Sequence, residues 1–157
     1  MRPRFRHFSW FRRSQKGSVL VETIVVLPII TIFSIGLLEF GTVLWQRHQI
    51  QTGVRDAARY LSRCTYDAAT CSKIAKNIAF YADPLGTAAT PTPGERVPGW
   101  DGSPASEFQV TPTTPAIGDV ITVYAQTAYR GSPLFSALGL EETIELEYYH
   151  QTRYFGF

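Results

Sequence analysis

Three residues near the N-terminus have the types and spacing of a proteolytic processing site. Gly17 and Ser18 end a basic segment, and Glu22 follows the glycine by five residues, with mainly apolar residues between them. The chemistry that this spacing permits is hydrolysis of the Gly17–Ser18 peptide bond by a separate peptidase. Cleavage there leaves Ser18 with a free α-amine, so we expect residues 1–17 to be a leader that is removed.

The charge distribution changes at Gly17. The leader holds six basic residues and no acid, whereas the rest of the chain holds nine bases and 13 acids. Positive residues beside a hydrophobic span stay in the cytoplasm, so everything after the span should lie outside. A basic leader could instead contact nucleic acid. We disfavour a nucleic-acid partner because no folded basic surface accompanies these residues: Arg2, Arg4, Arg6, Arg12, Arg13 and Lys16.

Residues 19–45 are mostly apolar, and this run exceeds the roughly 20 residues that a helix needs to cross a bilayer. An ordinary signal peptide has a shorter apolar core and is cut after it. Here the predicted cut precedes the apolar run, which is the pattern that a prepilin peptidase recognises. Residues 18–46 should therefore stay as a transmembrane helix. Pro28 should kink this helix, and neighbouring groups can bond the carbonyl that the proline leaves without a donor.

Two carboxylates interrupt this span. A charge at the centre of a membrane costs about 2.5–3.5 kcal/mol, so Glu22 should have a partner. The α-amine freed at Ser18 of a neighbouring subunit would neutralise it and set the axial stagger; alternatively, Glu22 lies at headgroup level and needs none. Glu39 is expected near the outer interface beside Trp45 and Arg47, where water reaches it, or at an assembly contact.

A set of residues within 16–61 resembles a known family, the TadE-like pseudopilins of tight-adherence (Tad) pilus systems. The resemblance implies a bacterial membrane-anchored protein that prepilin peptidase trims and that acts as a minor component in assembling an adhesive pilus. Thr23 stands where major pilins of the system usually carry tyrosine, and the chain is much longer, so a minor pseudopilin is favoured. The residues that carry the resemblance are Gly17, Val21-Glu22-Thr23, Leu27-Pro28, Gly36, Leu38-Glu39-Phe40-Gly41 and Val54-Arg55-Asp56-Ala57-Ala58-Arg59-Tyr60.

The resemblance also implies a location and partners. The protein would cross the bacterial inner membrane once, with a cytoplasmic N-terminus and a periplasmic head, and could enter an extracellular pilus. Its partners would be the lipid bilayer, prepilin peptidase, other pilins or pseudopilins, and the Tad assembly machinery.

Beyond residue 46 the helix should continue as an amphipathic extension that packs on the chain's own head. Gly53 weakens this extension by about 1 kcal/mol relative to alanine and permits a bend. The basic face should be solvated and carries Arg47, Arg55, Arg59 and Arg63. The apolar stripe repeats at helical spacing and comprises Ile50, Val54, Ala57, Ala58 and Leu61.

Cys64 and Cys71 are the only cysteines, and both fall on the oxidising side of the membrane. A disulfide between them would join the long helix to a second helix over residues 72–81, and would stabilise the fold by about 2.5 kcal/mol. Metal binding is disfavoured because the three histidines are scattered along the chain.

The remaining sequence predicts an α+β head over residues 47–157, with a single core and its helices on one face of a short antiparallel sheet. Residues 87–104 read as an exposed loop. Strands are expected at 108–111, 119–128 and 143–155, and residues 130–140 should form a surface excursion that caps the core. Most C-terminal aromatic residues should be core, whereas Phe157 is a candidate assembly contact.

No recognisable catalytic motif, cofactor-binding motif or small-molecule site is present in the sequence. We therefore expect a structural protein and no enzyme. Two alternatives stay open. One is an unprocessed, membrane-anchored periplasmic scaffold or binding module of the same apparatus. The other is a tethered periplasmic hydrolase, which a pocket pairing a histidine with a serine or cysteine nucleophile would favour.

Overall fold

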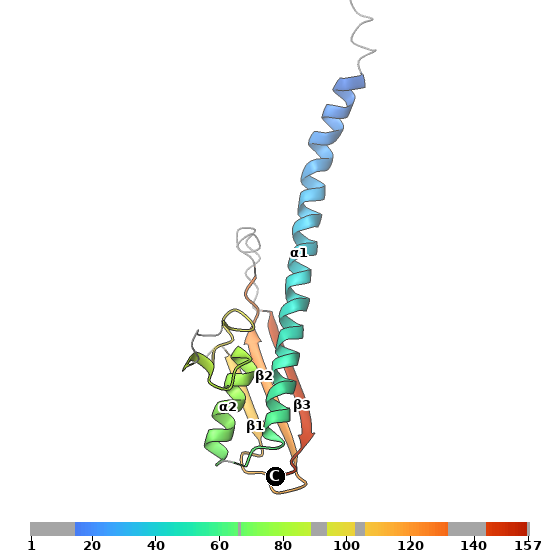
Figure 1. Ribbon diagram of the computed structural model, residues 1–157. Coiled ribbons are helices and arrows are strands. Elements are labelled where there is room, and N and C mark those ends of the chain that lie inside the picture. The colour runs from blue at the N-terminus through green and yellow to red at the C-terminus, as the bar shows by residue number, and fades with distance from the viewer. Residues whose placement is uncertain (1–14, 66, 89–93, 103–105, 132–143, 157) are drawn as a thin grey trace, which may run out of the picture. The chain divides into compact units, whose positions relative to one another are not determined.

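The computed structural model describes residues 15–65, 67–88, 94–102, 106–131 and 144–156 (Figure 1). Helix α1, Gln15–Leu61, is continuous. The chain divides into two compact units, Met1–Leu38 and Glu39–Phe157, so α1 contributes residues to both. The predicted long N-terminal helix is thus confirmed, and the leader up to residue 14 lies outside the described residues.

In the first unit, α1 presents an apolar surface on all sides. The helix is long and apolar enough to cross a membrane, and no residue in its most apolar window is buried. The helix runs past Pro28 without ending. The hydroxyls of Thr23 and Thr31 donate to the carbonyls of Val19 and Leu27, each across 2.8 Å. Their polarity is therefore satisfied on the helix itself.

The second unit contains a three-stranded antiparallel sheet in the order β1-β2-β3. The strands are β1, Ser106–Thr111, β2, Val120–Ala128, and β3, Glu145–Arg153. Ala125 in the middle of β2 lies opposite Phe108 on one side and Tyr148 on the other. The predicted antiparallel sheet and its three strands are confirmed. The expected excursion falls largely in residues 132–143, outside the described residues.

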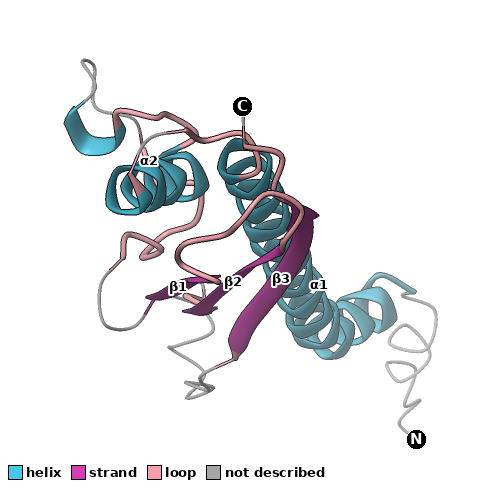
Figure 2. Ribbon diagram, turned by 90° about the horizontal axis from the view of Figure 1, so that it is seen from below, coloured by secondary structure: helices cyan, strands magenta, loops and turns pink. Residues whose placement is uncertain are grey.

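The core lies on one face of this sheet. Side chains alternate across a strand, and Ile121, Val123 and Ala125 of β2 all point inward and are at most 1% exposed. Helix α2, Ala68–Tyr81, adds its own buried residues to the same cluster. Both helices therefore cover the same face, as predicted (Figure 2). The stripe of α1 is also buried as predicted, and its members are Ile50, Val54, Ala57, Ala58 and Leu61.

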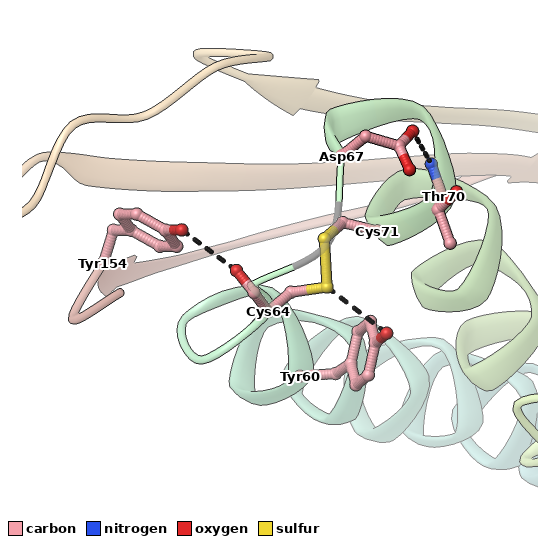
Figure 3. The surroundings of a disulfide bond; sticks show 6 residues. All are labelled: Tyr60, Cys64, Asp67, Thr70, Cys71 and Tyr154. Atoms are coloured by element: carbon pink, nitrogen blue, oxygen red, sulfur yellow. Dashed lines mark hydrogen bonds between the residues drawn. A yellow bond between two sulfur atoms is a disulfide. The ribbon is translucent and has the colours of Figure 1, made fainter. Parts of the chain in front are cut away.

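A disulfide joins Cys64, just after α1, to Cys71 near the start of α2 (Figure 3). The Tyr60 hydroxyl donates to Cys64 Sγ across 3.3 Å, since a disulfide sulfur carries no proton. The hydroxyl of Tyr154, beyond β3, donates to the Cys64 carbonyl across 2.9 Å. The predicted disulfide is present, and its surroundings link both helices to the end of the sheet.

Helix α2 begins at a specific cap. The Asp67 carboxylate accepts a hydrogen bond from the Thr70 backbone N–H across 3.0 Å. Hydrogen bonds from Thr70 lower the pKa of Asp67 below its ordinary value. An Asp at this position satisfies a backbone donor that the helix leaves unpaired, so the sequence defines where α2 begins.

The expectation that residues 87–104 form an exposed loop is wrong for part of that segment. Val97 and Trp100 are 0% exposed. The Trp100 ring packs edge-on against Phe80 of α2, with 5.0 Å between centroids. Small residues such as Gly53 and Ala79 leave space where α1 and α2 approach each other, and the loop places the Trp100 indole in that space.

Gly53 lies at this close approach. A Cβ built there would sit 2.5 Å from the Ala79 carbonyl oxygen and 3.0 Å from two ring atoms of Trp100. The helix continues through this position to Leu61. The glycine therefore serves close packing between α1 and α2, and does not mark a break.

The C-terminal aromatic residues divide between the core and the surface. Tyr148 and Tyr154 pack against the core cluster. Tyr149 and Phe155 are 64% and 49% exposed, so the prediction of core is wrong for these two. Phe157 lies outside the described residues.

Candidate processing and assembly site

Gly17 lies inside the first turns of α1, which begins at Gln15. A Cβ at this position would meet nothing within 4 Å. Its backbone is not among the positive-φ glycines. A glycine in a helix costs about 1 kcal/mol relative to alanine. The described fold therefore gives no steric or conformational reason for glycine here.

Glu22 lies one helical turn beyond Ser18, whose backbone is helical. The Glu22 side chain is exposed among exposed apolar neighbours, including Val19 and Val26. Among the described side chains, none forms an ion pair with Glu22. The structure thus leaves one acid on an apolar helix surface, next to the predicted cleavage bond.

Glu39 has a different environment from the water-accessible one expected. It is 6% exposed and belongs to the second unit. The hydroxyl of Tyr129, the residue after β2, donates to Glu39 Oε1 across 2.7 Å. Burial, together with the hydrogen bond to Glu39 and its charge, raises the pKa of Tyr129 well above its ordinary value. The phenol therefore stays protonated and holds α1 to the end of β2.

Gln46 makes a second polar link between the same segments. It is 2% exposed, and its Nε2 donates to the Arg130 carbonyl across 3.3 Å. The predicted apolar stripe of the head begins at Ile50, so Glu39 is expected near water or at an assembly contact and Gln46 is not identified. Glu39, Val43 and Gln46 extend that stripe toward the N-terminus at spacings of four and three, which is the signal that could have identified them.

A groove of about 720 Å³ lies between α2 and β1 in the second unit. Its lining is largely apolar and includes Leu61, Phe108 and Ile121, and Lys76 is the one charged residue in the part of the lining that the structure describes. The described lining contains no histidine, and both of its cysteines are in the disulfide. The arrangement that would favour a hydrolase, a histidine facing a serine or thiol, is not found among these residues.

Comparison with known proteins gives one match. A family model described as "TadE-like protein" matches residues 17–59. No match was found among curated proteins or among solved structures. The matched segment begins at Gly17, contains Glu22 and Glu39, and ends within the part of α1 that packs in the core. The family is a structural one associated with Tad pili, and the match confirms the resemblance inferred from the sequence: residues 17–59 are a TadE-like segment.

Proposed function

We propose that this chain is a minor pseudopilin, a structural component in the assembly of a Tad-type adhesive pilus. It is trimmed by prepilin peptidase after Gly17, is held in the inner membrane by the apolar part of α1 that precedes Glu39, and exposes the second unit to the periplasm. The expected end of the span at residue 46 is moved back because Glu39 and Gln46 bond to Tyr129 and Arg130 of the head. The observation that carries the proposal is the combination on α1 of a fully exposed apolar surface, one exposed acid at Glu22, and a helical glycine that the fold does not require.

Gly17 supports processing because it lowers the stability of the helix, and no contact within the folded chain explains why glycine is present there. Alanine at Gly17 would stabilise the helix by about 1 kcal/mol and would meet no neighbour. A peptidase that must approach the scissile backbone closely gains from the missing side chain. Gly53 shows the contrasting case, because there the chain itself occupies the space.

The acid supports assembly because an unpaired carboxylate in hydrocarbon is unfavourable. Cleavage would create a positive α-amine at Ser18, at the positive end of the helix dipole, where a cation is itself unfavourable. When helices pack in parallel, the Glu22 of one subunit can meet the Ser18 amine of the next. Both charges are then neutralised, and the pairing fixes the axial offset between subunits.

The first test is the N-terminus of the full chain extracted from membranes of its own host, determined by intact mass. We expect a chain that begins at Ser18 in the wild type and at Met1 in Gly17→Leu. Gly36→Leu is the matched control, because a Cβ at Gly36 also meets nothing within 4 Å. Glu22→Gln should be trimmed and inserted normally but should reduce recovery in pili.

The second candidate is a permanently anchored periplasmic scaffold or binding module of the same apparatus. The groove between α2 and β1 favours it, since about 720 Å³ of largely apolar space is large enough for a ligand. Under this candidate, Met1 is retained in cells with active prepilin peptidase, and neither Gly17→Leu nor Glu22→Gln changes the outcome. Retention of Met1 in such cells would reject the pseudopilin proposal.

A further inference from the structure

The face of the sheet opposite the core is open among the described residues. Strand alternation places Tyr124 and Gln126 of β2 on this face, beside Glu147 and Tyr149 of β3. Tyr149 is 64% exposed, and Val120 on the same face is 50% exposed. Helices α1 and α2 both pack on the other side. We call this surface, defined by Glu107, Tyr124, Gln126, Glu145, Glu147 and Tyr149, the outer face.

A hydrogen-bond network organises the outer face. The Tyr124 hydroxyl lies 2.8 Å from Gln126 Oε1 and 3.3 Å from Glu147 Oε2, and it can donate to either. Gln126 Nε2 donates to Glu145 Oε2 across 2.8 Å. Glu107 of β1 lies opposite Gln126 of β2. Three strands therefore bring three carboxylates together around one phenol and one amide.

The hydrogen-bond donors to these carboxylates are neutral groups: Tyr124 for Glu147, Gln126 for Glu145 and Gln109 for Glu107. Within the described residues, none of the three carboxylates forms an ion pair. Partial burial, then the hydrogen bond to Glu147 and the nearby charges of Glu147, Glu107 and Glu145, raise the pKa of Tyr124. The outer face thus presents three carboxylates beside the exposed Tyr149 ring on the edge strand β3, and Arg153, opposite Val120, lies at the other end of β3 on the same side of the sheet.

The same unit carries a positive counterpart. The arginine stripe, Arg55, Arg59 and Arg63, repeats every four residues along the end of α1 and the turn after Leu61, and it is exposed away from the buried stripe. Arg47 is also exposed, but it lies three residues before Ile50, nearer the buried side. The Arg59 side chain is 80% exposed, and its ion pair with Asp56 is long, at 4.0 Å. Arg55 donates its Nε–H to the Tyr148 hydroxyl across 3.2 Å, and its guanidinium lies 5.7 Å from the centroid of that ring, so its own chain already orders it.

The spacings on the two surfaces agree. Arg55 and Arg59 are one turn apart, a rise of about 6 Å along a helix. Glu145 and Glu147 are two residues apart on one strand, about 7 Å. A helix laid along β3 can therefore place successive arginines against successive glutamates. An exposed tyrosine beside them can also receive an arginine over its ring.

We propose that the outer face docks against the arginine stripe of a second copy of this chain. The inference rests on the proposed function, because it takes the chain to be a subunit of a repeating assembly. One molecule cannot satisfy its own pair, since α1 packs on the opposite face of the sheet. The contact joins two different surfaces, so each copy offers one of each, and repetition gives a ring or an open filament.

The experiment places a photoreactive residue on the outer face of the full chain in host membranes. Tyr149→p-benzoylphenylalanine keeps an exposed aromatic ring there. Irradiation should give an adduct of two subunits, mapped by peptide mass spectrometry to residues 47–63 of the second copy. Raising the salt in isolated membranes from 0.1 M to 1 M shortens the screening length from about 10 Å to about 3 Å and should lower the yield several-fold.

Charge reversal makes the test specific. Glu147→Arg and Arg59→Glu, each introduced singly, should reduce the adduct at least about threefold, and the two together should restore it. Lys73→Glu, an exposed charge reversal on α2 outside both surfaces, is the matched control and should leave the yield unchanged.

Three results would overturn the inference: no adduct, an adduct to a different protein, or losses that the double reversal does not restore. The N-terminus of the same sample separates this failure from failure of the proposed function. A chain that begins at Ser18 and is recovered in pili, yet gives no self-adduct, removes the docking contact and leaves the pseudopilin standing.

Discussion

The hydrogen bond between Glu39 and Tyr129 gives the sharpest test of how α1 is held in the head. Its perturbation is Tyr129→Phe, which removes one hydroxyl and keeps the ring. Both partners are 6% exposed, and the donor and acceptor are 2.7 Å apart. A buried hydrogen bond to a charged group contributes about 1.5–3 kcal/mol, so we expect that loss in the free energy of unfolding.

For a folded unit of this size the loss corresponds to about 6–12 °C in Tm. Glu39→Gln keeps an acceptor oxygen but removes the charge, and it should cost about 1 kcal/mol. The double variant should cost less than the two single losses together, with a coupling energy of about 1–2 kcal/mol. The assay is thermal and urea unfolding of the full chain in detergent under non-reducing conditions, followed by near-UV circular dichroism.

Tyr149→Phe is the matched control, because this hydroxyl belongs to a residue that is 64% exposed. It should change the free energy of unfolding by no more than about 0.5 kcal/mol. If the Glu39 and Tyr129 losses add within about 0.5 kcal/mol, the two side chains do not act as a pair, and our account of how α1 is held would be refuted.

Two further predictions concern the head. Gly53→Ala should lower the free energy of unfolding by up to about 2 kcal/mol despite its gain in helix propensity, because overpacking costs about 1–3 kcal/mol and the Ala79 carbonyl 2.5 Å away is backbone that cannot rotate aside. Gly41→Ala, where a Cβ meets nothing, should cause no loss, and equal urea midpoints for the two variants would contradict the packing argument. Stability should also fall above about pH 10, because an unfolded tyrosine ionises near its ordinary pKa of 10.0 whereas burial and Glu39 raise the pKa of folded Tyr129. The contribution is fully present below that pH, so urea midpoints should fall more steeply between about pH 9.5 and 11 in the wild type than in Tyr129→Phe, and parallel curves would argue against it.

Features that depend on local periodicity could be predicted from the sequence. The apolar stripe from Ile50 to Leu61 and the inward residues of β2 repeat at the helix and strand periods, and they are buried as expected. The disulfide followed from two cysteines placed between helical segments. In each case the residues that decide the structure are close in sequence.

Features that depend on distant partners could not be predicted in this way. Trp100 is buried because α1 and α2 leave a space at Gly53, and no pattern near Trp100 shows that space. Glu39 lies in an apolar run that reads as membrane span, yet its partner Tyr129 is 90 residues away. A polar residue in such a run has the same local sequence whether lipid, water or a buried phenol surrounds it. The exposed Glu22 gives the same ambiguity at the candidate site.

The disulfide has a mechanical consequence within the second unit. There, the part of α1 from Glu39 to Leu61 is held by its buried stripe and by the hydrogen bond from Tyr129. The Cys64–Cys71 crosslink lies just past Leu61, so a force on this part of the helix would reach α2 through covalent bonds as well as through packing. Displacing it would therefore disturb both helices and the core together.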